Sequence, residues 1–351
     1  MTARTRGPSG TVPPPVPPGN DPGHAAARLR AEGVSTRSTR CDVVGSTVLV
    51  GTASWTDPTI TAGEVFYPAG ANTPEARLRY YASQFPVVEV DSSYYAVPSA
   101  RSAALWVERT PDDFVFHVKA HALMTGQPTE IDRLPPAIVR ALPAEILSRH
   151  RAYAKDLPAE IVDEIWLLFA EALMPLRDSG KLAAVLMQYP RWFTPTTGNV
   201  DLLLDGQRRM RALFGDGVAG PVELRNRRWF GEERRKTERT VEFFREHCVP
   251  LVIVDGPQGL ESSVPMVAAV TTPGMVVARL HGRNARNWEA RGLPTVERYR
   301  YLYDHDELRA LVAELSAAAA ESPAVHVLFN NCHGNYGTTN ALEFGAMLSE
   351  L

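Results

Sequence analysis

Short apolar runs of strand length alternate with longer amphipathic stretches from residue 46 to the C-terminus. The longer stretches repeat their apolar residues at helical spacing, so the pattern predicts strands that alternate with helices. This order is typical of parallel βαβ units. The eight strands are expected to begin near Val48, Val87, Phe114, Ala183, Pro221, Leu251, Met275 and Val325.

Eight such strands close a (β/α)8 barrel, whose usual size is about 250 to 300 residues. We therefore predict one α/β domain, a (β/α)8 TIM barrel, over residues 46–351. A doubly wound open sheet is the alternative. That fold normally carries a glycine-rich turn after an early strand, and the segment GTASW at 51–55 does not match G-x-G-x-x-G.

One segment, at about 123–180, breaks the alternation and predicts a helical insertion after the third strand. Its first part is rich in proline, and its latter part has the pattern of a long amphipathic helix. Connections from strand to helix lie on the active-site face of a barrel. The insertion is therefore either a lid or pocket wall, or a decoration that packs on the outside.

Residues 1–45 have the composition of a disordered leader. Prolines at 13–15, 17 and 18 favour extended conformations, and the glycine, serine and threonine around them add nothing to a core. We expect this leader to be a solvated tail outside the barrel.

Charge and cysteine content narrow the classes of partner. The formal net charge of -3 provides no broad basic field, which argues against binding to nucleic acid or to an anionic membrane. Cys41, Cys248 and Cys332 are too few and too scattered for a disulfide framework or a cysteine zinc site, which favours reduced thiols and a cytoplasmic protein. No apolar run approaches the ~20 residues that a membrane helix needs.

Charged residues alternate with apolar ones at the ends of several predicted strands. In VELR, Leu224 faces opposite to Glu223 and Arg225, because side chains alternate across a strand. The apolar residues suit the face that helices cover, so the charged residues should point into the barrel. The catalytic candidates are Glu223, Glu89, Asp255, His281 and Lys119, and the substrate-binding candidates are Arg225, Arg279, Arg283, Trp55, Tyr94, Tyr95, Gln188, Trp229, Asn330 and Asn331.

The charged residues support two interpretations. They could pair with one another as a buried ion network, or they could form a ligand site. Several charges at the same strand ends favour a site, because apolar residues serve stability alone better than buried charges do. The aromatic residues that follow the strands are commonly loop packing when taken singly, but together they would make flat walls for a sugar ring or a base.

A metal ion is a further alternative. Glu89, Glu223, Asp255 and His281 are of the types that Mg²⁺, Mn²⁺ or Zn²⁺ accept as ligands. Lysine and arginine residues compete for the same carboxylates, and no H-E-x-x-H or comparable motif is present. We therefore predict no cofactor and keep a divalent metal as the alternative.

Many short motifs occur in an order that resembles the domain of unknown function 72 family. They are GTASW, FYP at 66–68, VEVDSSYYAVPS, FVFHVKA, LMQYP, VELRNRRWF, VDGPQG, RLHGRN and FNN. The resemblance runs from about Gly51 to the C-terminus and leaves out the leader. It implies a TIM barrel in a bacterial cytosolic protein, and it implies no particular reaction.

These observations predict an enzyme that acts on a small polar molecule, anionic or carbohydrate-like, by acid–base chemistry at the C-terminal mouth of the barrel. An isomerase or a hydrolase fits this description best. The alternatives are a metal-dependent hydrolase or isomerase, a protein that processes nucleic acid, and a binding protein without catalysis. The sequence makes no prediction about the oligomeric state.

Overall fold

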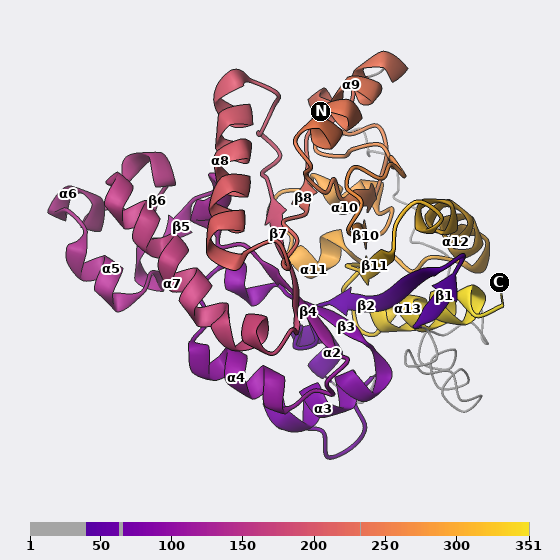
Figure 1. The fold of residues 1–351 in the computed structure, drawn as a ribbon. Helices are drawn as coiled ribbons and strands as arrows, with labels where there is room; N and C mark the ends of the chain where they lie inside the picture. The colour runs from indigo at the N-terminus through magenta and orange to yellow at the C-terminus, as the bar shows by residue number, and fades with distance from the viewer. Residues whose placement is uncertain (1–39, 63–65, 232, 351) are drawn as a thin grey trace, which may run out of the picture.

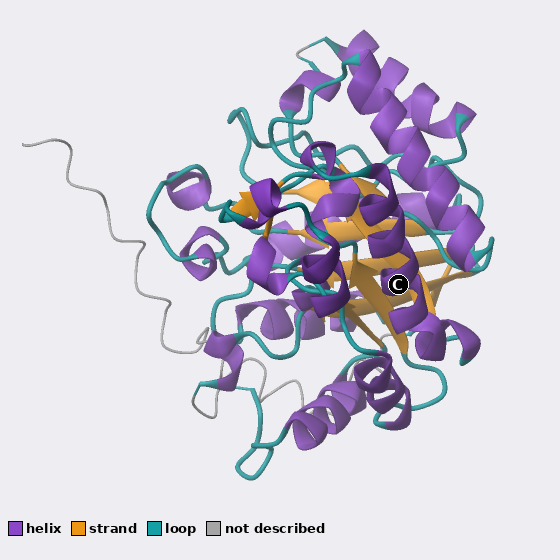
Figure 2. Ribbon diagram, turned by 90° about the vertical axis from the view of Figure 1, so that its left-hand side faces the viewer, coloured by secondary structure: helices purple, strands orange, loops and turns teal. Residues whose placement is uncertain are grey.

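Eight parallel strands form the centre of the molecule, with helices around them (Figures 1 and 2). The computed structural model describes residues 40–62, 66–231 and 233–350. All eight predicted strands begin within two residues of the expected position. The barrel strands are β2 (Ser46–Ala53), β3 (Val87–Val90), β4 (Val115–Lys119), β7 (Leu182–Gln188), β8 (Val222–Glu223), β9 (Ile253–Asp255), β10 (Val276–Leu280) and β11 (Ala324–Phe329).

Parallel pairing runs from β8 through β7, β4, β3, β2, β11 and β10 to β9. The remaining gap, between β8 and β9, is spanned by a single parallel bridge between Val222 and Leu251. Backbone hydrogen bonds support this bridge, because the amide of Val222 donates to Pro250 O at 2.8 Å and the amide of Val252 donates to Val222 O at 2.9 Å. The predicted (β/α)8 barrel is therefore confirmed, with a narrow seam between β8 and β9.

The helices cover the outer face of the barrel and bury the apolar side of each strand. The described helices are α2 (Pro58–Thr61), α3 (Pro74–Gln84), α4 (Ala100–Glu108), α5 (Pro136–Ala141), α6 (Ala144–Leu147), α7 (Ala159–Asp178), α8 (Thr197–Phe214), α9 (Arg234–Glu246), α10 (Ala285–Trp288), α11 (Thr295–Arg298), α12 (His305–Ala319) and α13 (Tyr336–Leu348). Side-chain caps fix several helix starts. Thr73 accepts a bond from Ala76 N at the start of α3, and Asp304 and Glu307 form a capping box on α12.

The junction of β2 and β3 requires a residue without a side chain. Gly51 pairs with Val87, and a Cβ atom at Gly51 would lie 2.0 Å from the carbonyl oxygen of Val87. Only glycine permits this close approach of the two strands.

The N-terminal boundary of the domain differs from the prediction. Cys41–Val43 forms the short strand β1, which pairs antiparallel with β2, so the folded part begins before residue 46. Residues 1–39, which make up most of the predicted leader, lie outside the described residues. Within the described residues, no helix has the length and apolar character needed to cross a membrane.

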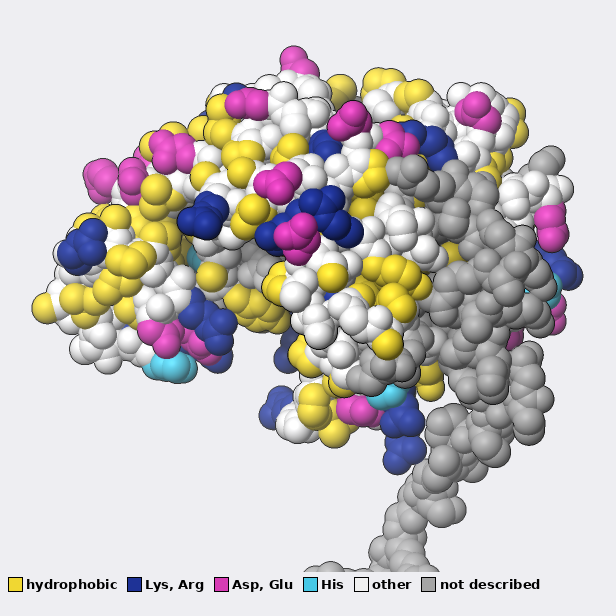
Figure 3. All heavy atoms as spheres, turned by 90° about the horizontal axis from the view of Figure 1, so that it is seen from below, with side chains coloured by type: hydrophobic (Ala, Val, Ile, Leu, Met, Phe, Trp, Pro, Cys, Tyr) yellow, Lys and Arg dark blue, Asp and Glu magenta, His cyan; other side chains and the backbone are white. Residues whose placement is uncertain are grey.

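The predicted insertion divides into two parts. Helix α7 packs on α4 and α8 as a regular helix of the barrel, so the extra chain is the segment before it. That segment contains α5, α6 and a two-stranded ribbon of β5 (Thr129–Glu130) and β6 (Arg151–Ala152). It has a small core of its own and forms a lobe at the side of the barrel, with hydrophobic side chains on its surface (Figures 1 and 3).

The insertion begins at the mouth of the barrel. Gln127 accepts a hydrogen bond from the hydroxyl of Tyr94 at 2.9 Å and donates one to Gln188 O at 3.0 Å. The insertion is thus fastened to the rim at its first residues, and the lobe stands beside the mouth.

Candidate active site at the barrel mouth

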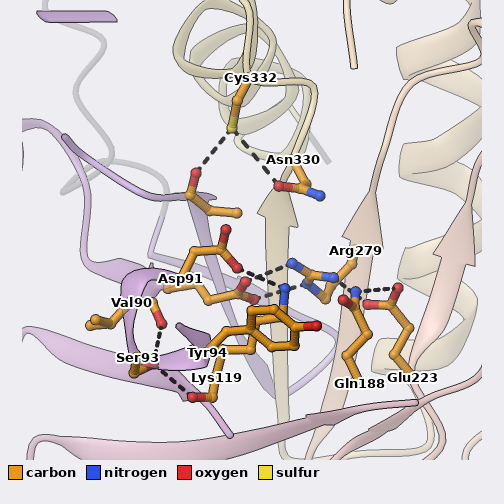
Figure 4. Close-up of polar contacts among 12 residues, drawn as sticks. Val90, Asp91, Ser93, Tyr94, Lys119, Gln188, Glu223, Arg279, Asn330 and Cys332 are labelled. Carbon is orange, nitrogen blue, oxygen red and sulfur yellow. Dashed lines mark hydrogen bonds and ion pairs between the residues drawn. The ribbon is translucent and has the colours of Figure 1, made fainter. Parts of the chain in front are cut away.

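An arginine lies between two buried glutamates inside the barrel. Figure 4 shows this arginine, Arg279, beside one of them, Glu223. Arg279 on β10 donates through Nε and Nη2 to both carboxylate oxygens of Glu89, at 2.9 and 2.6 Å, and through Nη1 to Glu223 Oε2. All three residues are at most 1 % exposed. Alternation along β3, β8 and β10 directs these side chains inward, as predicted.

The second oxygen of Glu223 has two further partners. Gln188 donates to Oε1 at 2.8 Å, and His281 Nε2 lies 3.0 Å from the same atom. The amide nitrogen of Asn330 lies 2.8 Å from His281 Nδ1. An amide nitrogen can only donate, so Nδ1 accepts and Nε2 carries the proton that His281 donates to Glu223.

The environments of the two glutamates move their pKa values in opposite directions. Burial raises the pKa of Glu89, and Arg279 only partly opposes this effect. Burial would also raise the pKa of Glu223, but Arg279 and then His281 hold it well below its usual value. Burial lowers the pKa of His281 to about 4, so this histidine is neutral at neutral pH.

A second ion pair faces the opening. Lys119 Nζ lies 2.9 Å from Asp91 Oδ1 and 4.7 Å from the centre of the Tyr94 ring, as Figure 4 shows. The Asp91 side chain is 37 % exposed, which makes it the accessible carboxylate of the cluster. Burial alone would raise the pKa of Asp91 and lower that of Lys119. The charge of each partner and the hydrogen bond between them, with contributions from Arg279 and Glu89, reverse this, so the pKa of Asp91 is lowered and the pKa of Lys119 is raised.

Arg225 reaches the mouth from β8. Its guanidinium lies 5.0 Å from the Trp288 ring, and Nη1 donates to the Tyr299 hydroxyl at 3.2 Å. Its Nε is 3.6 Å from Glu223 Oε1, which joins this group to the buried cluster. Two aromatic rings thus hold the cation in place.

Two predicted residues form a separate cluster outside the barrel interior. Asp255 is the register partner of Leu280, so its side chain lies on the face that helices cover. It accepts from Arg283 Nη2 at 2.8 Å and from the Tyr303 hydroxyl at 2.6 Å. Glu307 of α12 binds the same arginine at 3.1 Å. We call Asp255, Arg283, Tyr303 and Glu307 the outer cluster.

Three other predicted residues pack in the structure and do not line the mouth. Trp55 meets Trp106 of α4 edge to face, with ring centres 5.9 Å apart. Trp229 stacks on Phe193 and donates to Phe193 O at 2.7 Å. Asn331 is fully buried, and its amide nitrogen donates to Tyr301 O and Asn340 Oδ1. Tyr95, in contrast, is 48 % exposed beside Tyr94.

Several residues of the site were not among the candidates. Asp91 shares the face of Glu89, so the alternation along the strand could have identified it. His117 Nε2 and His326 Nδ1 approach to 2.7 Å inside the barrel, and burial lowers the pKa of His326 to about 4. Tyr299 and Gln127 lie in irregular segments, where no periodic pattern marks the direction of a side chain.

The described residues hold no group of three or more histidine, cysteine, aspartate or glutamate side chains suited to a metal ion. Arg279 and the neighbouring donors occupy the carboxylate oxygens of Glu89 and Glu223. Cys248 and Cys332 are free thiols.

Comparisons with known proteins agree with this architecture. Residues 49–351 match the family described as "Protein of unknown function DUF72". The UPF0759 protein YunF of Bacillus subtilis (strain 168) is 30% identical over 305 residues, which cover 86% of this chain and 94% of the relative. The crystal structure of a DUF72 family protein from Enterococcus faecalis V583 is similar with a TM-score of 0.67 at 29% identity, covering 87% of this chain and 96% of that chain. A DUF72 family protein from Thermotoga maritima MSB8 gives 0.64 at 29% identity, over 86% and 98%.

Proposed function

The chain belongs to the DUF72 family, whose description carries no reaction, and we propose from the site itself that it is an enzyme acting on a small anionic or hydroxylated molecule. In this proposal Lys119 and Arg225 bind the anionic or hydroxyl groups, and Asp91 moves a proton. The observation that carries the proposal is that the buried carboxylates are paired, whereas two cations keep unused hydrogen-bond donors. Glu89 and Glu223 are engaged by Arg279, whereas Lys119 and Arg225 retain donors that face the opening.

The spare donors follow from the hydrogen bonds of each cation. An ammonium group has three donors, and in the described structure Lys119 uses one of them, on Asp91. Arg225 uses Nη1 on Tyr299, and its Nη2 has no hydrogen-bond partner among the described residues. A ligand with an anionic group would satisfy these donors in a partly buried place, where such bonds are strong.

Asp91 is the group best placed to take a proton. Its Oδ2 has no hydrogen-bond partner within the described part of the chain, and its lowered pKa keeps it ionised at neutral pH. A carboxylate of lowered pKa is a weak base, so the proposed substrate class is limited to molecules in which a neighbouring carbonyl group acidifies a C–H proton. The C–H bond breaks and its proton passes to Asp91 Oδ2. The electron pair of that bond forms the C=C bond of an enolate while the carbonyl π pair moves onto the substrate oxygen, where Lys119 stabilises the charge.

The remaining groups provide a floor and walls. Glu89, Arg279 and Glu223 are rigid because each fixes the next, and they lie beneath the ion pair. Tyr94 and Tyr95 stand on one side, and Tyr299 with Trp288 stands at Arg225. A small ring or chain that contacted these groups would be oriented by few polar contacts.

Binding is tested by calorimetry with inorganic phosphate, fructose 6-phosphate and gluconate. We expect Lys119→Met and Arg225→Met each to weaken binding by about 10-fold or more, the range of a lost charge-assisted bond. Each has a matched control. Lys155 lies 5.5 Å from the Tyr153 ring on the lobe, and Arg283 lies 5.7 Å from the Tyr303 ring in the outer cluster. Lys155→Met and Arg283→Met should bind as the wild type does.

Proton transfer is tested by the exchange of deuterium from D₂O into the carbon-bound positions of fructose 6-phosphate, followed by NMR. Asp91→Asn should abolish exchange while binding remains within a few-fold, because the amide keeps the shape and loses the base. If no member of the panel binds, or if the control variants weaken binding as much as the mouth variants do, the proposal fails.

A further inference from the structure

Three exposed arginines and one exposed tryptophan lie on the two connected loops that follow β7 and β8, beyond the site described above. Arg191 and Trp192 follow β7, and Arg227 and Arg228 follow β8. All three arginines are exposed, and Trp192 is 54 % exposed. We call these four residues the arginine rim.

The two loops that carry the arginine rim are fastened to each other. Asn226 Nδ2 donates to Arg191 O at 2.6 Å, and Trp229 Nε1 donates to Phe193 O at 2.7 Å. The strands β7 and β8 lie next to each other, as Figure 1 shows, so both loops leave the barrel at the same place. The arginine rim is therefore one surface on a fixed support.

The arginines of this surface have no close counter-ion. In the parts of the chain that the structure describes, no carboxylate oxygen lies within 4.0 Å of these three guanidinium groups. The nearby Glu289 is engaged through Oε1 by the amide and hydroxyl of Ser262, at 2.9 and 2.8 Å. Arg191 and Arg227 also lower the pKa of Glu289, after these hydrogen bonds, so this carboxylate offsets a small part of their charge from beyond 4.0 Å.

Trp192 also lacks an aromatic contact among the described residues. Its neighbour Phe193 stacks on Tyr189 at 4.1 Å and on Trp229, but Trp192 makes no ring contact with any described aromatic residue. An exposed indole on the same pair of loops as three exposed guanidinium groups offers a flat face near positive charge. This combination recognises a ligand that has both phosphates and planar rings.

We propose that the arginine rim is a binding surface for single-stranded nucleic acid, with phosphates on Arg191, Arg227 and Arg228 and a base stacked on Trp192. A single strand fits better than a duplex, because only unpaired bases expose their faces for stacking. The net charge of the whole chain argued against such a partner, but it averages over a molecule in which this surface is locally basic. Single-stranded DNA and RNA both offer phosphates and unpaired bases, and the experiment below distinguishes between them.

The test measures binding of fluorescein-labelled dT20 and rU20 to the full-length protein by anisotropy, at several salt concentrations. Three phosphate contacts predict that the logarithm of affinity falls with the logarithm of salt with a slope of about -2. The triple variant Arg191→Gln, Arg227→Gln, Arg228→Gln should bring this slope close to zero. The matched control replaces Arg140, Arg208 and Arg309, which are exposed on α5, α8 and α12, by glutamine and should leave it unchanged.

The tryptophan is tested separately from charge. Trp192→Ala should weaken binding by about 5- to 100-fold, the effect of losing one stacked base, with the salt slope unchanged. Trp192→Phe keeps a ring and should restore most of the affinity. Relative strength of dT20 and rU20 binding shows which nucleic acid is preferred, and either order supports the proposal.

Three results would overturn it. The first is no binding of either strand at 50 mM salt. The second is equal binding of a 20-base-pair duplex and the single strands. The third is loss of affinity in the control triple variant as large as in the rim variant, which would show that the charge acts from elsewhere, including the basic residues at 1–39. The ligand panel for Lys119 and Arg225 is independent of all three.

Discussion

Two carboxylate–arginine clusters lie at the C-terminal strand ends, and they differ in which face of the strand carries them. The inner cluster of Glu89, Arg279 and Glu223 points into the barrel and is almost completely buried. The outer cluster joins β9 and β10 to α12, and the Arg283 side chain remains 34 % exposed. Both clusters pair an arginine with two carboxylates, so these residue types at the strand ends do not by themselves separate the two clusters.

The direction of the side chains decides what each cluster can do. An inward group lies on the path of a ligand that enters the mouth, whereas the outer cluster attaches a helix to the sheet. Burial also sets the energetic weight, because a charge in the interior depends completely on its partners. The inner cluster should therefore contribute more to the stability of the barrel than the outer cluster does.

The largest expected effect is the loss of Arg279. Arg279→Met removes the partner of two buried carboxylates, and breaking one buried pair costs about 3 to 5 kcal/mol. We expect a loss of at least this size in the free energy of unfolding, measured with urea at pH 7. The additional change Glu89→Gln should recover part of the loss, because the uncompensated charge disappears. If Arg279→Met unfolds as the wild type does, the buried ion network is not established in solution.

The second largest expected effect is a loss of unfolding free energy in acid, caused by two histidines inside the barrel. The folded-state pKa of His281 and of His326 is lowered to about 4, from 6.5. The unfolded chain then binds more protons between these values, so the stability that each histidine contributes is complete above pH 6.5 and is lost as pH falls towards 4. A shift of this size is worth about 3 kcal/mol at most for one histidine. His326→Gln should reduce the fall in unfolding free energy between pH 7 and 4.5, and an unchanged pH profile would contradict the assignment.

The outer cluster should respond less. Arg283→Met leaves Asp255 with the Tyr303 hydroxyl as a partner, and solvent reaches the site of the arginine. We expect a loss of about 1 to 2 kcal/mol in unfolding free energy, well below that of Arg279→Met. Chemical denaturation of the two variants side by side gives the comparison, and an equal or larger loss for Arg283→Met would reverse the ranking.

The fold could be predicted from the sequence because the patterns that mark strands and helices are local. Apolar runs and amphipathic stretches fix where strands and helices begin, and the eight predicted strands are the strands of the barrel. The leader was placed too long, because three residues of β1 gain their structure from pairing with β2 and carry no periodic pattern of their own.

The site followed only in part. Alternation along each strand correctly predicted that the side chains of Glu89, Glu223 and Arg279 point into the barrel. Asp255 was grouped with them, but its register partner Leu280 faces outward, so the Asp255 side chain does too. The register between strands is a long-range property that one strand does not reveal. Trp55, Trp229 and Asn331 were assigned from their position after strands, and the loops that hold them turn their side chains into the packing.

The smallest expected effect on the free energy of unfolding comes from changing Glu307, the residue of α12 in the outer cluster. Glu307 binds Arg283 at 3.1 Å and accepts from the Tyr301 hydroxyl at 2.6 Å, and its side chain is 20 % exposed. Glu307→Gln keeps one oxygen for Arg283 and Tyr301, but it removes the charge and loses the bond that Oε2 accepts from Asp304 N at 3.0 Å. It should therefore cost about 0.5 to 1 kcal/mol of unfolding free energy. Because solvent ions screen the ion pair, the difference from wild type should shrink in 1 M salt to the contribution of the lost helix cap. The matched inner variant, Glu223→Gln, should keep its larger cost at the same salt concentration, since the buried pair is not screened. Urea unfolding of both variants at low and high salt decides the matter, and a salt-independent loss for Glu307→Gln would show that the outer cluster is as closed to solvent as the inner one.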